Sequence, residues 1–108
     1  MAQDFERNTS NAVGTSAATL RTANSDDAIV GIMVANVASS QINVEVYIND
    51  GSNDIHLVKD APIPVGSSLQ VLDGGAKIVM QSGAALKVKS DTASSADVWV
   101  SVVDAIST

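Results

Sequence analysis

The segment Ile42–Asn49, "INVEVYIN", decides the fold class of this 108-residue chain. β-Branched residues alternate with polar or aromatic ones along it. The β-branched positions are Ile42, Val44, Val46 and Ile48. A period of two places one set of side chains on a buried face and the other set outward, as a half-buried strand requires. We therefore predict a half-buried β-strand here.

Strand patterns continue on both sides of this segment. In "ADVWVSVVDAI", which begins at Ala96, Val98 and Val100 are expected to point inward and Trp99 outward. The run "AIVGIMVAN" (Ala28–Asn36) is apolar on both faces and predicts a central strand covered on both sides. Shorter strands are predicted at 18–22, 55–59, 68–72, 77–81 and 85–90.

Turn signals separate these segments, and no segment has helical spacing with caps. About eight short strands with turns at this spacing predict an all-β fold, either an antiparallel β-sandwich or a small jelly-roll-like barrel. The first residues, "MAQDFERNTSNAVGTS", are polar and show neither strand nor helical periodicity. We therefore divide the chain into an extended N-terminal arm (1–16) and a β-sandwich domain (17–108).

Composition narrows the possible partners. The net charge of −6 repels phosphate backbones, and one Trp, one Tyr and one Phe are too few for a base-stacking surface, so we expect no nucleic-acid partner. The longest apolar run is interrupted by Asn36 and is too short to cross a bilayer, so we expect no membrane partner. The N-terminus has no apolar region typical of a secretion signal, and the absence of cysteine excludes disulfides and thiolate ligands.

The segment "NDGSND" (Asn49–Asp54) raises the question of a calcium loop. An EF-hand loop needs a carboxylate at its twelfth position, but counting twelve residues from Asp50 leads to Ala61. Gly51 supplies the positive φ that a tight hairpin needs. We therefore predict a hairpin tip and assign no metal-binding residue.

His56 is the one histidine in the sequence, and Ser52, Asp54 and Asp60 lie near it. A small hydrolase that uses His56 is therefore one hypothesis. The sequence has no G-x-S-x-G elbow to present a nucleophile, and no third group is indicated that would orient a base. We expect a surface histidine, a protein that is not an enzyme, and no catalytic or cofactor-binding residue and no cofactor.

Four stretches carry a family resemblance. They are "VGTSAATL" (Val13–Leu20), "ANVASSQINVEVYI" (Ala35–Ile48), "LVKDAPIPVGSSL" (Leu57–Leu69) and "SGAALKVKSDTASSADVWVSVV" (Ser82–Val103). In this order the chain resembles a family of small all-β structural proteins in the virions of tailed bacteriophages. The resemblance extends from Val13 to Ala105.

The resemblance implies a non-enzymatic virion protein, made in the cytoplasm of the host bacterium and located on the particle surface. We expect a capsid decoration (cement) protein that stabilises the particle as a homo-oligomer, for example a trimer, through its β-domain and arm. Its partners would be copies of itself and the major capsid protein. A neck or tail accessory protein that contacts neck or tail proteins, and a glycan- or receptor-binding module, remain alternatives. The candidate interface residues are Phe5, Arg7, Tyr47 and Trp99.

Overall fold

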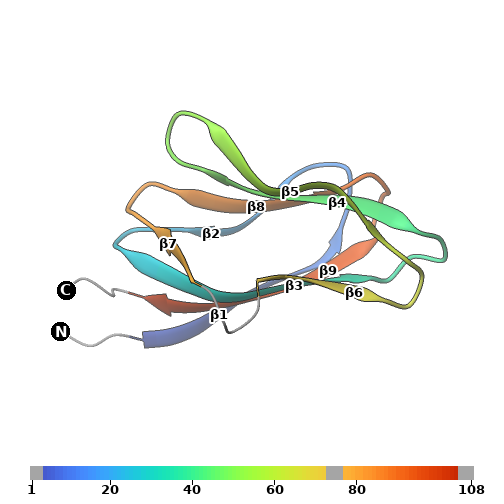
Figure 1. Cartoon of the computed structure of the whole chain (residues 1–108), viewed down its shortest axis with the longest axis horizontal. Helices are drawn as coiled ribbons and strands as arrows, with labels where there is room; N and C mark the ends of the chain where they lie inside the picture. Colours follow the sequence, from blue (N-terminus) through green and yellow to red (C-terminus); the bar gives the residue numbers. More distant parts are fainter. Residues whose placement is uncertain (1–3, 73–76, 105–108) are drawn as a thin grey trace.

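The structure, a computed structural model, describes residues 4–72 and 77–104 as two antiparallel sheets packed face to face (Figure 1). In the first sheet the strand order is β1-β9-β3-β6, and β7 also pairs with β3. In the second sheet the order is β2-β8-β4-β5. The all-β prediction is confirmed, and the two layers form a β-sandwich. The described residues include no helix that could cross a membrane.

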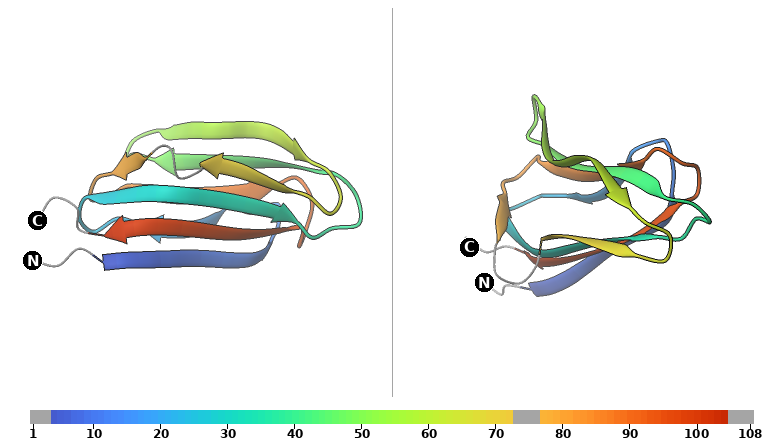
Figure 2. Two further views of the ribbon diagram at one scale, coloured as in Figure 1. Left: turned by 60° about the horizontal axis from the view of Figure 1, so that its bottom comes forward. Right: turned by 45° about the vertical axis from the view of Figure 1, so that its right-hand side comes forward.

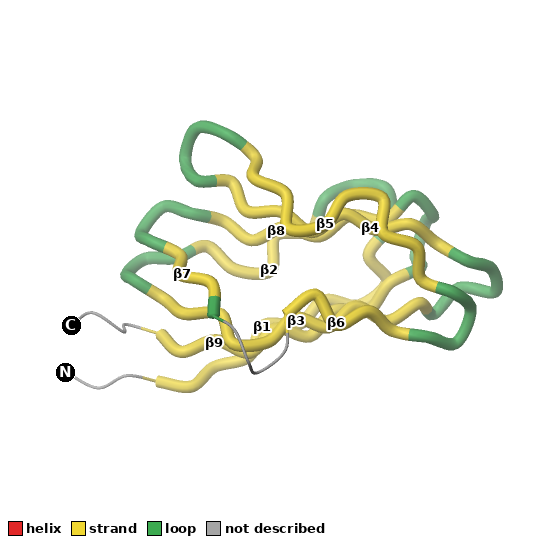
Figure 3. Tube along the Cα trace, in the orientation of Figure 1, coloured by secondary structure: helices red, strands yellow, loops and turns green. Residues whose placement is uncertain are grey.

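Strands make up most of the described chain (Figure 3). The first sheet consists of β1 (Asp4–Val13), β3 (Asp27–Asn36), β6 (Ser68–Leu72), β7 (Ile78–Met80) and β9 (Ala96–Asp104). The second sheet consists of β2 (Ala18–Thr22), β4 (Ile42–Asn49), β5 (Asp54–Ile63) and β8 (Ala85–Ser90). The described residues therefore form nine strands, and the one that the sequence did not predict is β1.

The core lies between the sheets and is built from the alternating apolar residues. Val44 and Val46 of β4 are fully buried, as are Leu86 and Val88 of β8. Val100 of β9 meets them from the first sheet and is also fully buried. The predicted inward positions of these strands are confirmed. Their β-branched side chains suit a pleated, buried surface.

Strand β3 is central, because it lies between β9 and β6, but it is not covered on both sides as predicted. Ile29, Ile32 and Val34 are buried in the core, whereas the side chain of Met33 points to the other face and is 38% exposed. A sandwich has two layers, so the second face of a central strand remains outside unless another molecule covers it. The apolar outer face of β3 is therefore a feature of the surface.

The predicted arm differs most from the structure. Asp4–Val13 is extended, but it forms an edge strand of the sandwich itself, paired with β9 from Asp4↔Asp104 to Ser10↔Val98 (Figure 2, left). No apolar period marks this strand in the sequence, because its inward positions Glu6 and Asn8 are polar and Phe5 is the one large apolar residue before Val13. Residues 1–3 of the predicted arm lie outside the described residues.

Candidate functional site

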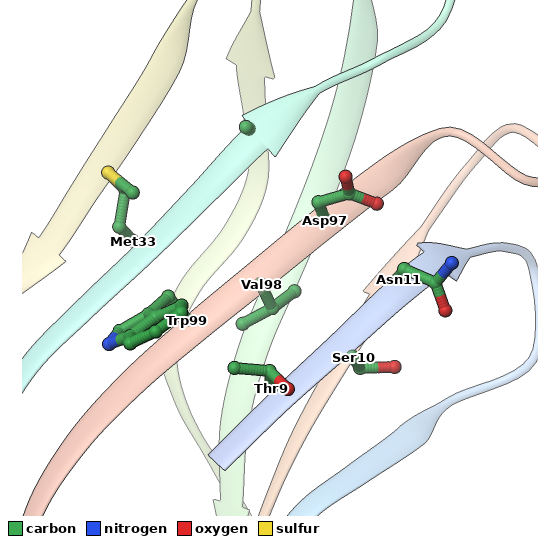
Figure 4. A pocket seen from close by; sticks show the side chains of 8 residues that line it. Thr9, Ser10, Asn11, Met33, Asp97, Val98 and Trp99 are labelled. Atoms are coloured by element: carbon green, nitrogen blue, oxygen red, sulfur yellow. The ribbon is translucent and has the colours of Figure 1, made fainter. Parts of the chain in front are cut away.

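A groove lies on the outer face of the first sheet, beside Trp99 (Figure 4). Its volume is about 440 Å³, and strands β1, β3 and β9 line it. The lining residues are Thr9, Ser10, Asn11, Met33, Ala35, Asp97, Val98 and Trp99. The groove combines an aromatic wall with hydroxyl, amide and carboxylate groups, which is the mixture that recognition sites typically have.

The alternation of β9 places Trp99 on this face. Val98 and Val100 enter the core, so Trp99 between them points outward and is 48% exposed. Its cross-strand partners are Thr9 on β1 and Met33 on β3. The predicted outward orientation of Trp99 is confirmed.

Arg7 packs on the Trp99 ring. Its guanidinium carbon lies 5.5 Å from the ring centroid, a cation–π contact, and Arg7 is not among the residues that line the groove. Phe5 is two positions away on the same side of β1 and is 86% exposed. Three of the four predicted interface residues thus lie on one surface. We call this surface, made of Phe5, Arg7, Met33, Trp99 and the groove, the Trp99 face.

The fourth predicted interface residue, Tyr47, lies apart from the other three. It belongs to β4 in the second sheet, where its ring is tilted against that of His56 with the centroids 5.0 Å apart. Burial raises the pKa of Tyr47, and the charges of Asp54 and Glu45 raise it further. Tyr47 therefore does not contribute to the Trp99 face.

Beside Tyr47, Glu45 is surrounded by basic side chains. The Glu45 carboxylate lies 3.0 Å from His56 Nε2, 3.2 Å from Lys59 Nζ and 3.8 Å from Lys89 Nζ. Burial by itself raises the pKa of Glu45, but hydrogen bonds from Lys59 and His56 bring it below its ordinary value. We call these four residues the Glu45 cluster.

The environment of His56 does not form a hydrolase triad within the described residues. Its hydrogen-bond partner there is Glu45, and no serine or threonine hydroxyl of the described chain bonds to it. The Asp54 carboxylate instead accepts a hydrogen bond from the Asn49 side chain at 2.8 Å. Ser52 lies at the hairpin tip, where its backbone N–H bonds to Asp50.

The "NDGSND" segment is the tip of the β4–β5 hairpin, as predicted. The backbone N–H of Asp50 donates to the Asn53 carbonyl at 3.0 Å, and Gly51 has a φ of 103°. The Asp50 carboxylate accepts the N–H groups of Asn53 and Ser52, which lowers its pKa. The turn itself thus uses the acidic group that suggested a calcium ligand.

A buried charge cluster that the sequence did not predict joins the two sheets. Arg21 of β2 contacts Asp27 at 2.7 Å, Glu6 at 3.0 Å and Asp104 at 3.2 Å, so it connects β2 to β3, β1 and β9. Its Nη1 also donates to the Asn8 side chain at 3.1 Å. The side chain of Arg21 is 9% exposed and that of Asp27 is fully buried. Arg21, Glu6, Asp27 and Asp104 are called the Arg21 cluster.

The pKa values in the Arg21 cluster follow from its excess of carboxylates. Burial alone lowers the pKa of Arg21, but hydrogen bonds and charges from Asp27 and Glu6 outweigh that effect and raise it. The pKa of Asp104 is raised, chiefly by its hydrogen bond with Asp27 and then by burial. The sequence signal for this cluster was weak, since Asp27 reads as a turn residue ahead of the apolar run.

One group of carboxylates has the spacing of metal ligands. Oxygens of Asp4, Glu6 and Asp104 lie within 4.8 Å of one another. Glu6 and Asp104 are already paired with Arg21, which supplies positive charge at this point. Spacing alone does not make such a group a metal site.

Comparison with known proteins found no matching family model, no matching curated protein and no matching solved structure. The functional interpretation of the chain therefore depends on its own sequence and geometry.

Proposed function

We propose that this chain is a non-enzymatic structural protein of a bacteriophage virion, a capsid decoration protein that attaches through the Trp99 face. The observation that carries the attachment surface is the half-exposed Trp99 with Arg7 packed on it. Tryptophan and arginine are the residue types most enriched among those that dominate binding energy at interfaces. The sequence resemblance supports the virion setting.

The surrounding surface supports the same proposal. Phe5 and Met33 add exposed apolar area around Trp99. Interface cores typically combine aromatic residues, methionine and arginine, with few other charged residues. The outer face of the second sheet differs, because the Glu45 cluster places charged groups there.

The attachment surface can be tested by a binding assay on particles that lack this protein. Trp99→Ala should weaken binding by about 30-fold or more, the effect of losing a dominant interface residue. Tyr47→Ala is the matched control, since it removes an aromatic residue from the opposite sheet and should leave binding within about twofold. Equal effects of the two variants would contradict attachment through the Trp99 face.

The location on the particle can be tested by copy number. Quantitative mass spectrometry of purified virions should give a number of chains comparable to that of the major capsid protein. A number close to that of the portal would instead favour the alternative, a neck or tail accessory protein. Absence from the virion would contradict both.

The groove favours a second candidate, a glycan-binding module displayed on the virion. Trp99 offers a ring face for stacking, and the side chains of Thr9 and Asn11 form no hydrogen bond with the described part of the chain. Sites for small molecules typically join an apolar wall to a few such polar groups. Binding on a glycan array that Trp99→Ala abolishes would support this candidate, and no binding on the array would exclude it.

A further inference from the structure

Strand β1 is attached to its sheet mainly through its backbone. Of its ten residues, seven are exposed, Asn8 and Ser10 are half-buried, and Val13 at the C-terminal end is buried. By contrast, every second residue of β9 from Ala96 to Val102 is buried in the core. Burial of apolar side chains is the main force that fixes a strand in place. The N-terminal part of β1 therefore depends on its ladder with β9 and on polar contacts.

Those polar contacts join β1 to residues of other strands. Glu6 and Asn8 accept hydrogen bonds from Arg21, and Arg7 packs on Trp99. None of them needs β1 and its partner strand to belong to the same copy of the chain. A β1 strand from a second copy could form the same contacts in the same register.

The pairing of β1 with β9 is interrupted at one point. The register shifts between Ser10 and Val13, and Ala12 in this gap has a φ of 54°. This left-handed conformation is unfavourable for alanine because of its Cβ. The Ala12 N–H donates to Asp97 Oδ1 at 2.9 Å, which holds the bend closed.

The chain immediately after Ala12 is firmly anchored. The carbonyl of Val13 accepts the N–H of Ser95, and the carbonyl of Gly14 accepts the N–H of Ser90, both at 2.9 Å. Gly14 also lies so close to the 93–94 turn that an added Cβ would come within 3.2 Å of the Ser94 nitrogen. Any hinge for β1 is therefore confined to Asn11 and Ala12.

We propose that β1 exchanges between copies of this chain. In the exchanged form Ala12 becomes extended, and residues 4–11 leave their own β9 and pair with β9 of a second copy. The partner's β1 then supplies the wall of the groove that contains Thr9 and Asn11, so each Trp99 face is assembled from two chains. Exchange preserves the contacts of residues 4–11 and relieves the strain at Ala12, but it breaks the hydrogen bond from the Ala12 N–H to Asp97. The relief of strain favours the exchanged form when the local concentration of the chain is high. This proposal rests on the proposed function, for which the family resemblance implies a homo-oligomer, and it identifies the segment that would join the subunits.

Engineered thiols can detect the exchange directly, because the natural chain contains no cysteine. Phe5 and Val103 are direct cross-strand partners, and such pairs have a Cα separation that a disulfide can bridge. Chains with Phe5→Cys and chains with Val103→Cys are mixed at high concentration, unfolded in urea, refolded together and oxidised. Circular dichroism verifies that both variants fold.

Exchange predicts a covalent heterodimer of the two chains on a non-reducing gel. The matched control replaces Val103→Cys by Lys59→Cys, an exposed position on β5 in the other sheet. A heterodimer yield no higher than that of this control would overturn the proposal. So would a Phe5→Cys/Val103→Cys double variant that forms only intrachain disulfides at every concentration.

Two substitutions at Ala12 test the hinge, and both retain the N–H that bonds to Asp97. Ala12→Gly removes the strain of the closed bend and should lower the exchanged fraction by about fivefold or more. Ala12→Val disfavours the left-handed conformation further and should raise the fraction. An exchanged fraction that neither variant changes would overturn the hinge and the proposal.

The outcome is separable from the test of the proposed function. If the thiols cross-link the two chains but the protein is absent from virions, the virion proposal fails and strand exchange stands. If the protein is present in virions at the copy number of the capsid protein but the thiols do not cross-link, strand exchange alone fails.

Discussion

The two charge clusters of this molecule have opposite compositions. In the Arg21 cluster one cation contacts three carboxylates, and its side chain is 9% exposed. In the Glu45 cluster one carboxylate contacts two lysines and a histidine, and these basic side chains are 32–62% exposed. The first cluster joins two sheets, whereas the second lies on the outer face of one.

Burial determines the structural role of each charge cluster. Removing a charge from water costs free energy unless an opposite charge pairs with it, so breaking a buried pair strongly destabilises the fold. A solvated pair is screened, and its side chains lose entropy when they are ordered, so it contributes little. We therefore expect the Arg21 cluster to stabilise the fold and the Glu45 cluster to affect mainly the charge of its surface.

The largest expected effect is that of Arg21→Met. This change leaves the fully buried Asp27 without its guanidinium partner and should lower the free energy of unfolding by about 3–5 kcal/mol. The measurement is urea denaturation followed by circular dichroism. Arg7→Met is the matched control, because Arg7 lies on the surface over Trp99 and its loss should cost about 1 kcal/mol or less. Similar losses for both variants would mean that burial does not distinguish the two arginines.

Asp104 of the Arg21 cluster and Glu45 of the Glu45 cluster should make opposite contributions to the pH dependence of stability. The raised pKa of Asp104 means that the folded state holds this proton more tightly than the unfolded state does. Its contribution to stability is fully present below the ordinary value of 3.8 and is lost as pH rises through the raised pKa. The lowered pKa of Glu45 has the reverse effect: its contribution is present above 4.5 and is lost as pH falls through the lowered value.

Unfolding measured from about pH 3 to about pH 7, a range that includes the ordinary carboxyl pKa values, tests this opposition. Relative to wild type, Asp104→Asn should gain stability as pH rises, whereas Glu45→Gln should lose it. For each variant, the difference from wild type in the free energy of unfolding is plotted against pH. Slopes of the same sign for the two variants would contradict the assigned pKa directions.

The smallest expected effect is that of Glu45→Gln at neutral pH. The loss should be at most about 1 kcal/mol, because its partners are solvated. In about 1 M salt, where the screening length is only ~3 Å, the loss should nearly disappear. Lys59→Gln removes one of the three basic partners of Glu45, so its loss should show the same salt dependence within the same limit. A loss that salt does not change would indicate that Glu45 has a packing role.

The sequence predicted the parts of the fold that depend on apolar alternation. Val44 and Val46 point inward and Trp99 points outward, as a period of two requires. The edge strand β1 was missed because its inward positions, Glu6 and Asn8, meet Arg21 rather than apolar side chains. A strand whose inward side chains pair with a buried charge has no alternation of apolar residues in its sequence.

The candidate site was predicted in part, for a related reason. The alternation of β9 correctly predicted that Trp99 points outward. Phe5 and Arg7 were candidate interface residues of the predicted arm, and no sequence pattern placed them beside Trp99. Tyr47 follows the same alternation, but it lies on the other sheet, and single-strand patterns do not reveal which strands share a sheet. The groove depends on the pairing of β1 with β9, a contact between segments far apart in the sequence.

The pairing of Asp4 with Asp104 has a topological consequence. The first and last described strands begin and end at the same end of the sandwich (Figure 1), so a short peptide could join Asp4 to Asp104 and close the backbone into a ring. New termini could then be opened at the Asn49–Asp54 hairpin tip, a surface turn of the kind at which circular permutation succeeds. In such a permuted chain the added peptide would tie the N-terminal end of β1 to its own β9, so that both strands of the Trp99 face come from one copy.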